Sequence, residues 1–115
     1  MATGSPAYAY EKLLVAIEYM ATGAGDVRER LANAFLSFHP VREEDFPPRL
    51  RKDWRWVKHQ LTRYGPLVDE NGKVFRGSVE NTMHKIKRVT GVRIAKKLLR
   101  LYHELDDHLR KKGEL

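Results

Sequence analysis

The stretch VRIAKKLLRLYHELDDHLRK, residues 92–111, decides the fold class of this chain. Its apolar side chains recur at steps of three and four residues, which is the spacing of one face of an α-helix. The positions of this seam are Ala95, Leu98, Tyr102, Leu105 and Leu109. The seam is too short for a long coiled coil, so it predicts a helix that packs in a bundle, within one chain or between two.

The rest of the chain shows the same spacing between helix start and stop signals. We expect helices at about residues 6–20, 27–38, 48–63, 78–89 and 92–111, with the acidic segment 41–48 as a loop or short turn. The expected inward positions are Tyr10, Leu13, Leu14, Ile17 and Ala21; Val27, Leu31, Ala34, Phe35 and Phe38; Leu50, Trp54, Val57 and Leu61; and Val79, Met83, Ile86 and Val89. Ser78 is the expected N-cap of the fourth helix, and Thr90-Gly91 separates it from the fifth.

One segment departs from this helical pattern. Asn71-Gly72 stands between short apolar runs, which is typical of a tight two-residue hairpin turn. Residues 65–77 are therefore expected to form a short β-hairpin or an ordered loop. Together these patterns predict an all-α fold, a compact bundle of four to five helices in a single domain over residues 1–115, with residues 1–6 as a frayed tail.

Composition excludes several classes of protein. The 115 residues include no cysteine, which excludes disulfides and thiolate metal sites and fits a reducing cytoplasm. The first ten residues lack the basic and apolar regions of a secretory signal. The longest apolar runs are far shorter than the ~20 residues that span a bilayer. We expect a cytoplasmic protein with no membrane contact and no cofactor.

The charge distribution is the strongest functional signal. Between Asn81 and His103 the chain has no aspartate or glutamate but seven cations. They are Lys85, Lys87, Arg88, Arg93, Lys96, Lys97 and Arg100. Residues 1–46 carry four Lys/Arg and seven Asp/Glu, a charge of −3, so the remainder of this +7 chain carries +10. Such segregation is typical of proteins that contact a nucleic acid, an acidic protein or an anionic surface.

Helical geometry places several of these cations on the same face of a helix. Arg93, Lys96, Lys97 and Arg100 fall within an arc of ~100° opposite the apolar seam, and Lys85, Lys87 and Arg88 lie away from the inward positions of the fourth helix. In the third helix, Lys52 and Arg63 lie near Trp56 and His59 on the side away from Trp54. Three roles remain open for Trp56: stacking on a nucleic-acid base, contacting a protein, or packing within the fold.

The simplest alternative is that the lysines and arginines only solvate the outer helix faces while their stems cover apolar surface. The stretch itself lacks the acids that would form i,i+4 pairs, and acids return to the stripe only at Glu104 and Asp107, which argues against it because such faces normally carry both signs. A helix-turn-helix with Gly91 at its turn is also disfavoured. Positions of that motif that should be small or buried fall on Lys87, Lys97 and Arg100. Phosphate contact without sequence readout is the better interpretation.

The chain contains no catalytic or metal-binding motif with the residue spacing that such a motif requires. In the run from His103 to His108 the residue four after His103 is Asp107, so the zinc motif HExxH is not formed. His39 lies in a polar loop near Glu43 and Glu44, but no spacing there supports acid–base catalysis. The chain has no phosphate-cradling glycine loop. We predict no catalytic residues, no metal ligands and no enzymatic activity.

Four short segments resemble a group of small bacterial helical proteins of unknown function. They are Tyr10-Glu11-Lys12-Leu13, Ala21-Thr22-Gly23-Ala24-Gly25, Glu44-Asp45-Phe46-Pro47 and Gly77-Ser78-Val79. The resemblance covers about residues 8–105 and implies a bacterial, cytosolic, helical protein. It implies no activity and no functional residues, and the final segment of that group is more acidic than Lys85–Arg100 here.

Two functions therefore remain open. The first is a non-enzymatic protein that binds DNA or RNA through its phosphate backbone, or regulates through such binding, without sequence specificity. Its expected contact residues are Lys85, Lys87, Arg88, Arg93, Lys96, Lys97, Arg100, Trp56, Lys52 and Arg63. The second is a helical protein–protein interaction subunit, either a homodimer or an accessory of a larger complex with an acidic partner.

Overall fold

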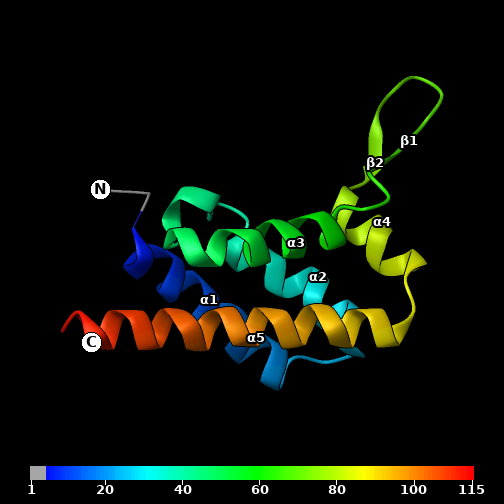
Figure 1. Ribbon diagram of the computed structural model, residues 1–115. Coiled ribbons are helices and arrows are strands. Elements are labelled where there is room, and N and C mark those ends of the chain that lie inside the picture. The colour runs from blue at the N-terminus through cyan, green and yellow to red at the C-terminus, as the bar shows by residue number, and fades with distance from the viewer. Residues whose placement is uncertain (1–4) are drawn as a thin grey trace.

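The computed structural model describes residues 5–115, except for the side chain of Phe75. Within these residues the chain is an all-α bundle of five helices with one short hairpin, as the sequence predicts. The helices are α1 (Pro6–Thr22), α2 (Val27–Phe38), α3 (Arg51–Leu61), α4 (Ser78–Lys85) and α5 (Arg88–Lys111). The strands are β1 (Leu67–Val68) and β2 (Val74–Arg76). Helix α5 runs the length of an elongated body of 52 × 27 × 22 Å, along which α1, α2 and α3 pack (Figure 1).

The first two helices begin at capping residues. The Ser5 hydroxyl accepts a hydrogen bond from the Tyr8 N–H at 3.1 Å, and Pro6 takes the first position of α1, where its missing N–H costs nothing. Asp26 caps α2 in the same way through the Arg28 N–H at 2.8 Å. Of the expected frayed tail, residues 1–4 lie outside the described residues, whereas Ser5 and Pro6 belong to the helix start.

The segment between α2 and α3 consists of two single 3₁₀ turns, Glu43–Asp45 and Pro48–Leu50. The carboxylate of Asp45 is fully buried and accepts a hydrogen bond from the Arg42 N–H at 2.7 Å. Because the second turn leads directly into Arg51, α3 starts three residues later than expected and ends at Leu61. Of the acidic residues of this segment, Asp45 thus binds the local backbone.

The core lies between α5 and the three helices beside it. Five side chains of α5 are buried: Ile94, Leu98, Leu101, Leu105 and Leu109. They pack with an aromatic group in which the Trp54 ring stacks on Phe46 at 4.8 Å and meets the edge of Phe38 at 5.8 Å. Ala95 and Tyr102, which the sequence placed in the seam, lie at its half-buried margin. The prediction is therefore confirmed for Leu98, Leu105 and Leu109, while Ile94 and Leu101 are buried in place of Ala95 and Tyr102.

A polar contact fastens α1 to α5 at this margin. The rings of Tyr10 and Tyr102 stack at 5.2 Å, and the Tyr10 hydroxyl donates a hydrogen bond to Asp106 at 3.0 Å. Its hydrogen bond with the Tyr102 hydroxyl, its burial and its bond to Asp106 together raise the pKa of Tyr10 above its ordinary value of 10.0. Tyr10 therefore remains a protonated hydrogen-bond donor across neutral pH.

The break between the last two helices lies at Ile86 and Lys87, so the prediction of a break at Thr90-Gly91 was wrong. Ile86 is buried in an extended conformation, and its carbonyl accepts a hydrogen bond from Arg28 Nη1 at 3.1 Å. Because α5 begins at Arg88, Val89 lies on its outer face and is 57% exposed instead of buried. Ala21, also expected inside, is exposed.

The hairpin forms, but its turn differs from the predicted two-residue turn. The Gly72 N–H donates to the Asp69 carbonyl at 2.9 Å, and only Gly72 in this loop has a positive φ, +80°. The Asp69 carboxylate accepts from the N–H groups of Asn71 and Lys73, each at 2.9 Å. The side chain of Asp69 thus organises a wider turn, with Gly72 as the residue in left-handed conformation. Figure 1 shows the hairpin projecting from the end of the body.

Gly91 marks the closest approach of α5 to α2. A Cβ on Gly91 would lie 3.0 Å from Val27 Cγ1 and 3.1 Å from Arg28 Cγ. We expect Gly91→Val to lower the free energy of unfolding by about 1–3 kcal/mol, because a branched side chain overpacks this contact. Gly91→Ala should stay within about 1 kcal/mol of the native protein, because the gain in helix propensity offsets the tight contact.

Urea unfolding followed by circular dichroism measures both changes. Thr90→Val is the matched control, because it places the same branched residue at the neighbouring half-buried position without adding bulk. If Gly91→Val proves as stable as the native protein, the close packing of α5 on α2 is not a constraint on this fold.

Candidate nucleic-acid interface

Helix α3 lies antiparallel beside α5, held by ion pairs at two levels (Figure 1). Arg49, just before α3, pairs with Glu104 at 2.8 Å, and Asp53 pairs with Lys97 at 3.3 Å. The end of α3 contacts α4 instead, where the Lys85 ammonium lies 5.9 Å from the centre of the Tyr64 ring. These contacts bring α3 beside the Lys97 edge of α5 and the end of α4 beside the residues that follow α3.

On α5 itself, Arg93, Lys96 and Arg100 are exposed and share one outer stripe. This stripe follows from the buried seam, because residues about 180° from it must face outward. Lys97 is different, since it lies at the edge of the stripe and turns toward α3. Its side chain is 28% exposed and pairs with Asp53.

We use the name basic face for the exposed cations of α3, of the Tyr64 region and of the outer stripe of α5. They are Lys52, Arg63, Lys85, Arg93, Lys96 and Arg100. Lys52 belongs to this face because it lies one turn before Trp56, whose ring is 5.7 Å from the Lys97 ammonium of α5. Arg88 lies ~140° around α5 from Arg93, so it faces another flank. Lys87 stands between the two helices as the N-cap of α5.

The cations of the acid-free stretch differ from the others in their partners. Six of its seven cations are exposed and make no ion pair with any carboxylate of residues 5–115; only Lys97 is paired. Outside this stretch, ion pairs hold Arg28, Arg42, Arg49, Arg55, Arg76, Arg110 and Lys111. The outer face of α5 is therefore a region of uncompensated positive charge.

Trp56 is half-buried and packs against the core. One neighbour of its ring is the ammonium of Lys97, whose charge is balanced by Asp53. Of the three roles that the sequence left open, packing within the fold is the one that these contacts describe. Lys52 and Arg63 remain exposed nearby.

Tyr64, which the sequence did not indicate, is an aromatic residue that lies beside two cations without an ion pair among residues 5–115. Its ring lies 5.6 Å from the Arg63 guanidinium and 5.9 Å from the Lys85 ammonium, and the residue is 47% exposed. Arg63 and Lys85 were expected on separate pieces of surface, and the fold brings them together at this ring. Only the tertiary contact between α4 and the end of α3 reveals it.

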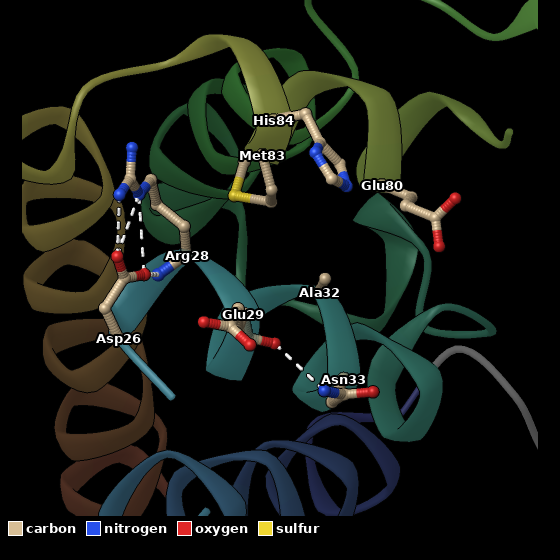
Figure 2. A pocket seen from close by; sticks show the side chains of 8 residues that line it. All are labelled: Asp26, Arg28, Glu29, Ala32, Asn33, Glu80, Met83 and His84. Carbon is tan, nitrogen blue, oxygen red and sulfur yellow. Dashed lines mark hydrogen bonds and ion pairs between the residues drawn. The ribbon is translucent and has the colours of Figure 1, made fainter. Parts of the chain in front are cut away.

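A pocket of about 450 Å³ opens between α2 and α4 (Figure 2). Its lining residues are Asp26, Arg28, Glu29, Ala32, Asn33, Glu80, Met83 and His84. The Asp26 carboxylate is neutralised by Arg28 at 2.7 Å, and Glu80 lies on the opposite side of the pocket and pairs with Arg76 at 3.6 Å. Three charged residues of the lining, Asp26, Arg28 and Glu80, are thus held in ion pairs around the rim.

The polar loop near His39 borders a second pocket of about 560 Å³. Its acids are engaged in ion pairs, because Glu43 binds Arg55 at 2.8 Å and Glu44 lies 3.9 Å from Arg42. His39 itself is exposed. The acids of this polar loop, whose spacing does not support acid–base catalysis, therefore form surface salt bridges.

Metal ligands do not gather in the described residues. No group of three or more His, Asp or Glu side chains able to hold an ion occurs within residues 5–115. Asp107 instead pairs with Lys111 at 3.0 Å along the helix. Burial lowers the pKa of the neighbouring His108, and the charges of Lys112 and Arg49 lower it further.

Comparison with known proteins found no matching family model, no matching curated protein and no matching solved structure. Across residues 5–115, none of the helices combines the length and the apolar character needed to cross a bilayer. The description of this surface therefore rests on its own geometry.

The Asp26–Arg28 pair connects the pocket rim to the break before α5, because Arg28 also binds the Ile86 carbonyl. Hydrogen bonds from Arg28 lower the pKa of Asp26 from 3.8 to about 2. Since the folded state holds this carboxylate in its charged form, the pair stabilises the fold above about pH 4 and its contribution is lost as the pH falls toward 2. We expect Asp26→Asn to remove this part of the acid sensitivity.

The measurement is urea unfolding of both proteins between about pH 5 and pH 2, the range that contains both pKa values of Asp26. Asn keeps the side-chain oxygen that caps α2, so the variant removes the charge and retains the cap. The difference in unfolding free energy between the two proteins should shrink as the pH falls. A difference that stays constant over this range would contradict the assignment. Glu70→Gln, in the exposed hairpin loop, controls for the loss of one negative charge.

Proposed function

We propose that this protein binds nucleic acid through the phosphate backbone, without reading its sequence, by means of the basic face. The observation that carries the proposal is that all six cations of the basic face are exposed and pair with no carboxylate of residues 5–115, in a chain that pairs many of its other cations. Like charges on one surface repel each other and oppose folding. A polyanion that lies along the surface relieves this repulsion and gains the release of its own counterions.

The side chains available on α5 favour phosphate contacts over base readout. Adenine edges are read by Asn or Gln in paired hydrogen bonds, and the chain has no Asn or Gln after Asn81. Between Arg88 and Arg100 the exposed residues of the helix other than its cations are the apolar Val89, Val92 and Leu99. Lysines and arginines on such a helix position a backbone without selecting a sequence.

The start of α5 adds to the positive field. No side chain caps this end, and its first turn contains no acidic residue. The free N–H groups of a helix N-terminus carry a partial positive charge, which favours a phosphate nearby. Lys85, Lys87 and Arg88 surround this end, so the helix dipole and the side-chain charges act in the same direction.

The salt dependence of binding tests the proposal. We expect micromolar binding to duplex DNA at about 50 mM salt, and a log–log slope of about −5 if six cations meet phosphates. Neutralising one contact, as in Lys96→Gln or Arg100→Gln, should make the slope shallower by about 0.9 and weaken binding to every sequence equally. Fluorescence anisotropy with labelled duplexes of two unrelated sequences measures both effects.

Lys12→Gln is the matched control for these variants. Lys12 lies on α1 two positions after Tyr10, the residue that faces α5, so its side chain is directed away from that helix. Its neutralisation changes the net charge by the same amount and should leave the slope unchanged. The absence of binding at low salt, or an equal loss in Lys12→Gln, would overturn the proposal.

Breaking the Asp53–Lys97 ion pair tests the proposal by adding a free cation to the surface instead of removing one. Asp53→Asn releases Lys97 from its partner, so we expect tighter binding and a slope that is steeper by about 0.9. The fold should lose no more than about 1 kcal/mol, because partly exposed pairs contribute little to stability. Glu43→Gln releases Arg55 elsewhere on α3 and is the control for net charge. Equal gains in the two variants would show that total charge, and not the basic face, sets the affinity.

A further inference from the structure

The main chain around Tyr64 is fixed by two buried polar side chains of α4. The Tyr64 N–H donates to the Thr82 hydroxyl at 3.1 Å, and the Asn81 amide donates to the Gly65 carbonyl at 2.9 Å. Asn81 and Thr82 are 1% and 0% exposed. Burying such groups costs free energy unless they are hydrogen-bonded, and here both bonds act on the residues at the end of α3. Tyr64 is therefore held in place although it lies on the surface.

The ring of Tyr64 remains accessible at this fixed position. The residue is 47% exposed, and both neighbouring cations lie near the ~6 Å limit for an attraction to the ring. Neither Arg63 nor Lys85 forms an ion pair that would hold its side chain over the ring. Each can therefore move aside without breaking a salt bridge.

We propose that Tyr64 is a stacking platform for an unpaired base, and that the preferred ligand of the basic face is single-stranded nucleic acid. This inference rests on the proposed function and adds the form of the nucleic acid to it. A base placed on the ring gains stacking energy whatever its identity, because every base has a π-face. Arg63 and Lys85 then meet the phosphates on either side of the stacked base.

A duplex cannot use this platform, because its bases are stacked on one another and their faces are covered. Trp56 is a poorer platform than Tyr64, since it packs against the core and lies beside a lysine that is held by Asp53. The accessible ring and the unpaired cations therefore occur together at Tyr64.

Three labelled ligands separate stacking from phosphate binding. They are an oligothymidylate strand, a strand of equal length made of abasic sites, and a duplex of equal length. The full chain should bind the thymidylate strand about 5- to 100-fold more tightly than the abasic strand, which carries the same phosphates. Tyr64→Ala should abolish this preference and leave duplex affinity unchanged, whereas Tyr64→Phe should retain the preference. An oligouridylate strand then distinguishes RNA from DNA as the better ligand.

Equal binding of thymidylate and abasic strands by the native protein would overturn the stacking inference, and so would a preference that survives in Tyr64→Ala. The proposed function would stand in either case if the duplex is bound with a steep salt dependence. Failure to bind any of the three ligands at low salt would overturn both. The comparison of strands on the native protein needs no variant, so the test remains decisive even if Tyr64→Ala is unstable by circular dichroism.

Discussion

The buried seam of α5 is the constraint on which the rest of this structure depends. Leu98, Leu101 and Leu105 are fully buried where α1, α2 and α3 meet the helix. Because a helix that buries one stripe exposes the opposite one, the same register fixes which side chains face outward. On this helix the outward stripe carries Arg93, Lys96 and Arg100 without acids until Glu104. The buried seam and the α5 part of the basic face are therefore two sides of one helix, and neither can shift along the helix without the other.

Helix α4 connects this core to the surface around Tyr64. It has only eight residues, which is too short to be stable by itself, so its position comes from tertiary contacts. Val79 and Met83 bury apolar surface, while Asn81 and Thr82 bind the chain at the end of α3. One oxygen of Asn81 has no hydrogen-bond partner in this structure. The buried side-chain amide of Asn81 is tolerated although its oxygen accepts no hydrogen bond, because its NH2 group donates one to a main-chain carbonyl.

The sequence predicted the starts of α1 and α2, where an apolar period follows a start signal at Pro6 or Asp26, whereas α5 was predicted from its apolar period alone and starts four residues earlier than expected. It failed at Gly91 because glycine lowers helix propensity by only ~1 kcal/mol, which close packing on Val27 outweighs. The actual break at Ile86 has no local signal, since its carbonyl is held by Arg28, 58 residues earlier. Tyr64 was missed for the same reason. The cations of the surface were predictable as a set, but which of them are paired depends on α3.

The two aromatic residues at the α3–α5 side show why pairing matters more than proximity. The rings of Trp56 and Tyr64 each have a lysine ammonium within 6 Å of the ring centre. The distance to the nearest lysine therefore does not distinguish the two residues. The lysine beside Trp56 has its charge balanced by Asp53, and the ring is partly covered. The lysine beside Tyr64 has no such partner among residues 5–115. A polyanion gains most where positive charge is uncompensated and a ring is open, and in this fold both conditions are met at Tyr64.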